Sequence, residues 1–503
     1  MLIQPHLRDY LSDNRVLRYR LELALLRSEV YGHHEKFSMQ LSALVALFPL
    51  GRSLFSTAEV SATTASVTTS DSDGSISSSD YSAGEEYAAQ DAMQIGAMPP
   101  VTAHSTARQR IEKAHLSQRM SRKSEGWGTS HPRYRLLEAL FGFTDYRERN
   151  MAELNRWRSL YKNVAKGQKQ VLERVAHYSK KLDDIEELIY ENESVCKTIV
   201  SIAMQYYGIT QKELNKHILE AQKAGRQADK ISVTQTLKHF VRDWAAEGAF
   251  ERDEAFPCIL STLANLKSAS DESKQLRVLL PGSGVGRLGH EIANLQGMIA
   301  STVHSYADVH KTTGFEVTIN EWSMFMNVGY RFIESQLDPD SVNIYPFVDG
   351  MSHHATTSDM TRSIALPDIA PNRDVLLVEG DFNTVLNDHE GGFDIIVTHY
   401  FIDTARNLMA YFDTIHRLLR PGGKWMNFGP LLYGSGPFVQ LSLDEIIAVV
   451  EDMGFVFEDL SDECGALTFE GKKVRSKASQ YGFNNKALTR HAYLAQVWIV
   501  RKS

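Results

Sequence analysis

The chain has 503 residues, 43% of them hydrophobic, so it is long enough for more than one folded unit and can bury a sizeable core. Its formal net charge is −8. This balance argues against a general nucleic-acid-binding protein, which is more often basic, and says little about a site for a small molecule.

The cysteines and the apolar runs indicate the cellular compartment in which to expect the protein. Cys196, Cys258 and Cys464 are far apart and show no metal-ligand spacing, so we expect no metal site, no disulfide framework and a reducing compartment. The apolar runs Leu23–Leu26 and Leu41–Leu50 are shorter than the roughly 20 residues that span a bilayer, and they lack signal-peptide flanks. We expect no membrane association and a cytoplasmic protein, with the nucleus as the alternative.

The first 106 residues divide by composition. Residues 1–55 carry apolar residues at helical spacing (Leu17, Leu21 and Leu25) and predict one or two helices without an evident partner. Residues 56–106 are dominated by Ser, Thr, Ala, Asp and Gly. Because so little apolar surface cannot offset the entropy lost on ordering, we expect a disordered linker there.

Residues 107–250 predict a helical region. In the stretch Val171–Tyr190, apolar residues recur every three or four positions along one side. Gly and Pro are nearly absent between Met151 and Tyr206. The basic run Arg108–Lys123 is interpreted as a solvated face rather than a nucleic-acid contact.

From residue 251 to 503, strands and helices alternate, and the change of pattern is placed after Pro257. This βα order predicts an α/β fold with a doubly wound sheet, whose ligands bind at the carboxyl ends of the strands. We expect strands at Leu276–Leu280, Phe315–Ile319, Asp374–Glu379, Asp394–His399, Lys424–Phe428 and Tyr493–Arg501, and helices at Leu288–Leu295, Ser323–Ser335, Thr404–Leu419 and Leu443–Met453.

A glycine loop follows the first of these strands. Gly282, Gly284 and Gly286 lead into a helix, and their missing Cβ atoms allow a tight turn and a close approach of a ligand to the main chain. The spacing from Gly284 to Gly289 also matches a dinucleotide fingerprint. The loop alone therefore leaves both an NAD-type cofactor and S-adenosylmethionine open.

Acidic residues follow the next two strands. Glu321 stands where a carboxylate can accept hydrogen bonds from both hydroxyls of a ribose; a solvated glutamate at the start of a helix is the alternative. Glu316 lies within the strand and is expected to point away. Asp381 and Phe382 could bind the amino group and the ring edge of an adenine, although Gly-Asp is also ordinary turn chemistry. A dinucleotide domain has no specific need for that pair, which favours S-adenosylmethionine.

The fourth strand brings His399 and Asp403 to the mouth of the same cleft. Asp403 is interpreted as the group that orients or deprotonates a nucleophile, with capping of the following helix as the alternative. His399 is expected to be a packing or adenine-side residue rather than a base. The Pro421–Gly423 turn is a structural crossover familiar in small-molecule methyltransferases.

With these motifs in view, the chain resembles the carnosine N-methyltransferase family, loosely over 132–234 and closely from 235 onward. The resemblance implies a Rossmann-like class I methyltransferase sheet, with residues 107–250 capping the cofactor site and residues 251–503 forming the methyltransferase domain. The segments that carry it are Phe240–Trp244, Pro281–Leu288, Asn320–Ser323, Gly380–Phe382, Phe401–Ala405, Pro421–Trp425 and Gly429–Tyr433.

The same resemblance implies the site residues. S-adenosyl-L-methionine would be bound by His239, Arg242, Gly282, Glu321, Asp381, Phe382, His399 and Tyr411. The substrate would contact Asp403, Tyr493 and Gly434.

The chain departs from the family pattern at several of these positions. His239 replaces a Gln, and Gly434 stands where the animal enzymes have His. His491-Ala492-Tyr493 leaves one clear Tyr before the last strand, and Gln296–Thr312 is an insertion before Glu321. The cofactor half of the site therefore matches the family pattern better than the substrate half does.

The resemblance implies transfer of a methyl group to an imidazole nitrogen of carnosine, which gives anserine, or of a related histidine-containing peptide. Asp403 would hydrogen-bond the distal imidazole N–H and stabilise the positive charge that develops. The alternatives are an NAD(P)-dependent oxidoreductase, a non-catalytic scaffold on a methyltransferase fold, and methylation of histidine in proteins. A homodimer is compatible with the sequence, which does not determine the oligomeric state.

Overall fold

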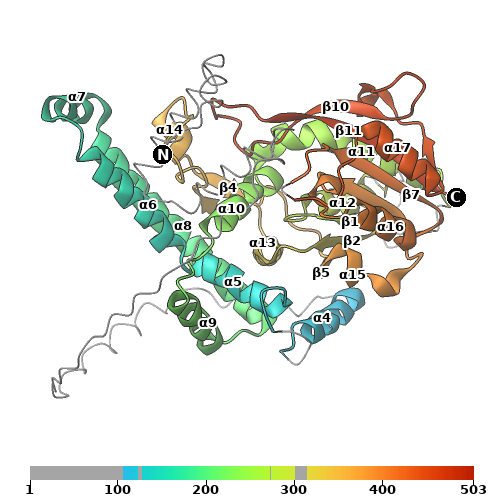
Figure 1. Ribbon diagram of the computed structural model, residues 1–503, viewed down its shortest axis with the longest axis horizontal. Helices are drawn as coiled ribbons and strands as arrows, with labels where there is room; N and C mark the ends of the chain where they lie inside the picture. The colour runs from blue at the N-terminus through green and yellow to red at the C-terminus, as the bar shows by residue number, and fades with distance from the viewer. Residues whose placement is uncertain (1–105, 123–126, 272–273, 301–313, 435) are drawn as a thin grey trace, which may run out of the picture. The chain divides into compact units, whose positions relative to one another are not determined.

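The computed structural model describes residues 106–122, 127–271, 274–300, 314–434 and 436–503 (Figure 1). These residues belong to one compact unit. The helices predicted for 1–55, and all but the last residue of the linker predicted for 56–106, lie outside the described residues. So does most of the predicted insertion Gln296–Thr312.

The part of the chain that precedes the sheet is helical. The long helix α8 carries buried apolar residues at helical spacing, including Leu182, Ile185 and Ile189, and packs against α5, α6 and α13. The helices are α4 (Ala107–Arg119), α5 (Pro132–Thr144), α6 (Tyr146–Tyr161), α7 (Lys166–Ala176), α8 (Tyr178–Tyr207), α9 (Gln211–Lys223) and α10 (Lys230–Trp244), and α13 (Met324–Glu334) belongs to the later part of the chain.

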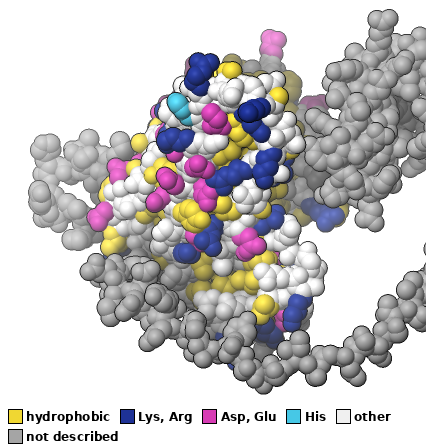
Figure 2. Space-filling model, turned by 90° about the vertical axis from the view of Figure 1, so that its left-hand side faces the viewer, with side chains coloured by type: hydrophobic (Ala, Val, Ile, Leu, Met, Phe, Trp, Pro, Cys, Tyr) yellow, Lys and Arg dark blue, Asp and Glu magenta, His cyan; other side chains and the backbone are white. Residues whose placement is uncertain are grey.

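The predicted stripe over Val171–Tyr190 is interrupted in the structure. His177 adopts a left-handed conformation (φ 46°) between α7 and α8, so the stripe is divided between two helices. Val171 is 51% exposed and Val175 66% exposed, because α7 buries none of its residues. The solvated face of this region mixes both signs of charge, as Figure 2 shows.

Residues 108–119 of the predicted basic run lie in α4, and they do more than form a solvated face. Arg108 Nη2 donates a 2.7 Å hydrogen bond to Thr318 Oγ1, and Arg108 Nε lies 3.5 Å from Glu316 Oε1. Gln109 donates to the carbonyl oxygens of Arg373 and Val375. The helix is therefore attached to the edge of the sheet.

The sheet has nine strands in the order β5-β2-β1-β6-β7-β11-β10-β9, and β8 also pairs with β11. Strands β5, β2, β1, β6 and β7 are parallel, and β11 is antiparallel. The strands are β1 (Leu276–Pro281), β2 (Phe315–Glu321), β5 (Leu376–Glu379), β6 (Phe393–His399), β7 (Leu419–Gly429), β8 (Phe455–Glu458), β9 (Ala466–Leu467), β10 (Arg475–Gln480) and β11 (Ala492–Lys502).

Helices cover both faces of this sheet, as the predicted doubly wound fold requires. Val278 and Leu280 of β1 pack with α11 (Ala249–Ser268) and α12 (Arg287–Ala300). Leu279 faces the opposite layer, with α15 (Phe382–Val385), α16 (Leu408–Leu418) and α17 (Leu443–Asp452). The strand order reverses between β1 and β6, which places a ligand crevice at the carboxyl ends of those strands. The predicted Rossmann-like class I sheet is confirmed.

Several predicted boundaries are wrong, each for a local reason. Pro257 lies inside α11 rather than at its edge. The helix predicted from Thr404 begins only at Leu408, because residues 402–404 form a separate 3-10 turn, η3 (Ile402–Thr404). The Pro421–Gly423 segment is part of β7, which already begins at Leu419. The small antiparallel pair β3 (Val342–Ile344) and β4 (Ile364–Leu366) was not predicted.

The expectation that the cysteines form no disulfide is also wrong. Cys258 on α11 is bonded to Cys464, which lies 206 residues later in η4 (Asp462–Cys464). The sequence did not indicate the pairing because it depends on α11 packing beside β10. Cys196 is free and buried. Among the described residues, no helix is both long and apolar enough to cross a membrane.

Candidate active site

The glycine loop after β1 depends on left-handed backbone conformations. Gly282, Gly284 and Gly286 have φ values of 64°, 58° and 86°, which glycine adopts without steric cost. A Cβ on Gly286 would lie 2.7 Å from the Tyr330 ring, and one on Gly282 would overlap the Phe401 ring. The loop therefore requires glycine both for its conformation and for its close packing.

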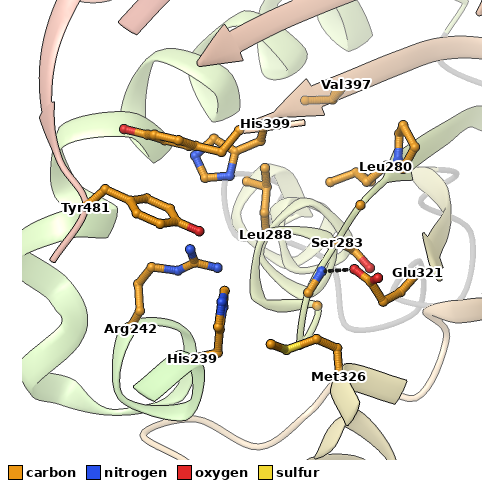
Figure 3. A pocket seen from close by; sticks show the side chains of 16 residues that line it. His239, Arg242, Leu280, Ser283, Leu288, Glu321, Met326, Val397, His399 and Tyr481 are labelled. Atoms are coloured by element: carbon orange, nitrogen blue, oxygen red, sulfur yellow. Dashed lines mark hydrogen bonds between the residues drawn. The ribbon is translucent and has the colours of Figure 1, made fainter. Parts of the chain in front are cut away.

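A cavity of about 210 Å³ opens beside this loop (Figure 3). It lies at the carboxyl ends of β1, β2 and β6, and α10 closes its other side. The structure therefore brings together residues from elements far apart in the sequence. The predicted site residues that line it are His239, Arg242, Gly282, Glu321 and His399, joined by Leu288, Met326, Tyr400 and Tyr481 among others.

Glu321 ends β2 with its carboxylate against the glycine loop. Oε2 accepts a 2.9 Å hydrogen bond from the Gly284 N–H, and Oε1 accepts 2.7 Å hydrogen bonds from the N–H groups of Trp322 and Ser323. Burial raises the pKa of Glu321, while these backbone donors act in the opposite direction. Glu316 instead pairs with Arg108 at the sheet edge, as expected of a residue that points away.

The helix α10 contributes His239 and Arg242 to the side of the cavity that faces the glycine loop. Arg242 forms two hydrogen bonds with the neighbouring Asp243, Nε to Oδ1 at 2.7 Å and Nη2 to Oδ2 at 3.2 Å. An ideal Cβ on Gly284 would be 3.6 Å from His239 Nδ1 and 3.7 Å from Arg242 Nη2. Burial, and then the charge of Arg242, lower the pKa of His239 to about 3, so the imidazole is neutral.

His399 ends β6 on the opposite wall. Burial, followed by the charge of Arg242, lowers its pKa to about 3. Next to it the Tyr400 ring stacks on Tyr481, with 4.6 Å between the ring centroids. The Tyr493 ring lies 6.0 Å from Tyr400 and 6.2 Å from Tyr481. Tyr493 thus supports the aromatic wall without lining the cavity itself.

Phe382 and Tyr411 form an aromatic cluster with Phe401. The Phe401 and Tyr411 rings stack at 4.5 Å, and Phe382 meets both edge-on at 5.5 and 5.6 Å. This cluster adjoins the loop, because the Phe401 ring packs on Gly282. Asp381 is exposed and caps α15, since its carboxylate accepts a 2.9 Å hydrogen bond from the Asn383 N–H. None of these side chains lines the cavity.

Asp403 lies in η3, immediately after the Phe401 segment. It does not cap α16, whose N-cap residue is Asn407. Its side chain is buried, and Oδ2 accepts a 3.1 Å hydrogen bond from the Leu432 N–H. Burial raises the pKa of Asp403 to about 6, against the effect of its backbone donors. Gly434 is exposed and follows Leu432 in the same loop.

Tyr400, Phe401 and Tyr481 were not assigned to the site from the sequence. Tyr400 and Phe401 directly follow His399, so their position at a strand end was a usable signal. Tyr481 follows β10, which pairs with β11 so that Ser479 lies opposite Tyr493. No local pattern in the sequence indicated that hairpin.

The model of the family described as carnosine N-methyltransferase matches residues 220–503, more than half of the chain. The chain belongs to this family. A Rattus norvegicus protein named carnosine N-methyltransferase is 27% identical over 418 residues, covering 80% of this chain and 90% of the rat protein. A protein of the same name from Schizosaccharomyces pombe is 30% identical over 324 residues, covering 59% and 79%.

Solved structures show weaker similarity. A Thermotoga maritima protein described as an SAM-dependent methyltransferase, possible histamine N-methyltransferase, has 12% identity and a TM-score of 0.27, covering 54% of this chain and all of that one. A putative methyltransferase from Methanococcus maripaludis has 14% identity and a TM-score of 0.26, covering 51% and 91%. Similarity at this level adds nothing to the strand order described above.

Membership in the family confirms the predicted S-adenosylmethionine-dependent N-methyltransferase and decides against the NAD(P)-dependent oxidoreductase. The cavity also fits this methyl donor. His239 Nδ1 and His399 Nε2 are buried and have no hydrogen-bond partner among the described residues. Because buried polar atoms are normally paired, a polar ligand is expected between them.

Different residues of the cavity suit different chemical groups of the methyl donor. The carboxylate of Glu321 suits ribose hydroxyls, and the guanidinium of Arg242 suits the carboxylate of the methionine part. The rings of Phe382, Phe401 and Tyr411 pack beside the glycine loop without lining the cavity. When bound, the donor supplies a methyl group already activated by its positive sulfur, so the contribution of this chain is chiefly to position the reactants.

Proposed function

We propose that this family member methylates an imidazole nitrogen of carnosine, producing anserine, or of a closely related histidine-containing peptide. The observation that carries the proposal is the buried carboxylate of Asp403. No cationic side chain among the described residues pairs with it; its hydrogen-bond partners are backbone N–H groups. A carboxylate in this condition can accept a hydrogen bond from an imidazole N–H.

Asp403 would set the tautomer of the substrate. If its carboxylate accepts the hydrogen bond of one imidazole nitrogen, the other nitrogen keeps its lone pair for attack. An N–CH₃ bond then forms as the S–CH₃ bond breaks, leaving S-adenosylhomocysteine. The positive charge that develops on the ring is stabilised by Asp403, which accepts the hydrogen bond and then the proton.

The tyrosines next to the cavity would hold the rest of the substrate. Tyr400, Tyr481 and Tyr493 form a continuous aromatic wall between His399 and the β10–β11 hairpin. Faces of such rings suit an imidazole, and more so the cationic ring that results from methyl transfer. Gly434 lies in the loop that contacts Asp403, so a small residue there would leave room for the backbone of a peptide.

The test is methyl transfer by the purified full-length chain. It would be incubated with methyl-labelled S-adenosylmethionine and, separately, with carnosine, free histidine, and protein-derived peptides with and without histidine. We expect label on carnosine, and NMR of the product would identify the methylated nitrogen. A preference for histidine within longer peptides would favour protein methylation instead. No transfer to any imidazole compound would refute the proposal and point to a different methyl acceptor.

Asp403→Asn tests the role of the carboxylate directly. The amide can still accept the Leu432 N–H but carries no charge, so turnover should fall by about 100-fold or more. Binding of S-adenosylhomocysteine should stay within about threefold, because Asp403 does not line the cavity. Unchanged turnover would show that Asp403 has no part in the reaction.

A further inference from the structure

The backbone is strained at Phe483, three residues beyond β10. Phe483 has φ 60°, a left-handed conformation that bulky residues rarely adopt. Such a conformation persists only where neighbouring groups enforce it, and it often marks a functional site. The segment Gln480–Phe483 also carries Tyr481, which lines the cavity.

Two carboxylates on α11 hold this segment. Glu251 Oε1 accepts hydrogen bonds from the N–H groups of Gly482 (2.7 Å) and Phe483 (2.5 Å). One turn later, Glu254 accepts hydrogen bonds from the backbone and side chain of Gln480. Glu251 is buried, and burial raises its pKa against the effect of these two backbone donors. The left-handed turn is thus held by a buried carboxyl group that accepts two of its backbone N–H groups.

The segment is also tied to the connection between α10 and α11. Asn484 Oδ1 accepts a 2.8 Å hydrogen bond from Arg362 Nη2. The same arginine pairs with Glu247 in η1 (Ala246–Gly248), Nε to Oε2 at 3.0 Å. Arg362 therefore connects Asn484, the residue after this segment, to the 3-10 turn that follows α10.

The turn places the rings of Tyr481 and Phe483 against side chains of α10 that line the cavity. The Arg242 guanidinium lies 4.9 Å from the centroid of the Tyr481 ring and 5.6 Å from that of Phe483. The Phe483 ring also packs on His239, with 5.0 Å between centroids. Figure 3 shows Tyr481 and Arg242 together at one side of the cavity, with His239 beside them. Phe483 thus contacts both α10 residues that line the cavity.

We propose that Glu251 and Phe483 are positioning residues for the methyl donor: Glu251 holds the left-handed turn, and the turn places Phe483 against His239 and Arg242. This rests on the donor half of the site and not on the identity of the methyl acceptor. Neither residue lines the cavity. Their effect is exerted through the orientation of the Arg242 guanidinium, which determines whether it can form a charge-assisted hydrogen bond with a carboxylate.

The test compares variants by titration with S-adenosylhomocysteine. Glu251→Ala should weaken binding by at least about tenfold, whereas Glu251→Gln should stay within about threefold because its amide oxygen accepts the same two N–H groups. Phe483→Ala should weaken binding by a similar factor. Phe483→Tyr keeps the aromatic ring and should bind S-adenosylhomocysteine about as tightly as the unmodified chain. Ser261→Ala is the matched control, because Ser261 lies on the same helix and binds Glu463, away from the cavity.

Steady-state kinetics separate positioning from a general loss of structure. The KM for the methyl donor should rise in Glu251→Ala while kcat at saturating donor changes by less than about threefold. Wild-type affinity in a folded Glu251→Ala protein, or equal weakening by Ser261→Ala, would overturn the proposal. If Glu251→Ala does not fold, Phe483→Ala decides, and unchanged binding there would equally overturn it. None of these measurements of ligand binding requires a methyl acceptor, so failure of the proposed function would be recognised separately.

Discussion

The indole Nε1 of Trp244 donates a 2.7 Å hydrogen bond to the carbonyl oxygen of Val285. This bond joins the last residue of α10 to the middle of the glycine loop. Trp244 is fully buried, so the bond is shielded from competing water. The helical part of the chain and the sheet are therefore connected at the cavity that they share.

Trp244→Phe should loosen this connection. The ring volume is largely kept, but the Val285 carbonyl loses its buried donor, which costs roughly 1–3 kcal/mol in the free energy of unfolding. S-adenosylhomocysteine binding should weaken several-fold with it. Trp498→Phe is the matched control, because Trp498 is equally buried and its Nε1 has no partner among the described residues. Denaturant unfolding and ligand titration would measure both variants, and equal losses would contradict the assigned role of the bond.

Glu321→Gln should weaken binding of S-adenosylhomocysteine by about 10- to 100-fold. A hydrogen bond to a charged acceptor contributes about 1.5–3 kcal/mol, and the neutral amide loses that contribution toward the ribose hydroxyls. Glu316→Gln serves as the control on the same strand, because Glu316 pairs with Arg108 outside the cavity. Calorimetric titration of the two variants would test this, and comparable affinities for both would argue against a ribose role for Glu321.

The titration of the Asp403 carboxyl group should be visible in the pH dependence of folding stability. Its pKa is raised to about 6 in the folded protein from the ordinary 3.8. Because the folded state then binds the proton more tightly, Asp403 makes folding progressively less favourable as pH rises from about 4 to about 6. Above pH 6 the full penalty applies, on the order of 3 kcal/mol.

Asp403→Asn removes this titration while keeping the Leu432 hydrogen bond. The Tm of the variant relative to the unmodified chain should therefore rise between pH 4 and pH 7. Thermal unfolding in a series of buffers would show it. A Tm difference that stays constant over this range would mean that the carboxylate is not perturbed.

Counting thiols would test the bond between Cys258 and Cys464. The chain has three cysteines, of which Cys196 is free in the structure. The unfolded, unreduced protein should therefore react with one equivalent of a thiol reagent, and the reduced protein with three. Because the bond closes a loop of 206 residues, Cys464→Ser should lower the free energy of unfolding by about 2–5 kcal/mol. Three reactive thiols before reduction would show that the bond does not form in the purified protein.

The sequence alone determined the parallel core of the sheet and most of its strand-end residues. Parallel strands bring their carboxyl ends to one edge, so the glycine loop, Glu321 and His399 could be assigned to one site without knowledge of the packing. Glu321 and His399 lie in the cavity for this reason. Asp381, assigned by the same reasoning, is exposed and does not line the cavity. The predicted element boundaries were wrong where one residue type is compatible with two structures. Pro257 lies inside α11 instead of ending a helix, and the helix predicted from Thr404 begins at Leu408.

Only the tertiary structure decided what closes the cavity. Arg242 contacts Tyr481 and Phe483, which lie more than 200 residues later in the sequence. Cys258 is bonded to Cys464 at a sequence separation of 206, and no periodic pattern in the sequence indicates either pairing. Such contacts depend on how α10, α11 and the β10–β11 hairpin pack, and packing is set by many side chains at once. The position of Asp403 in a 3-10 turn, where burial raises its pKa, has the same origin: a carboxylate acquires its environment only when distant segments surround it.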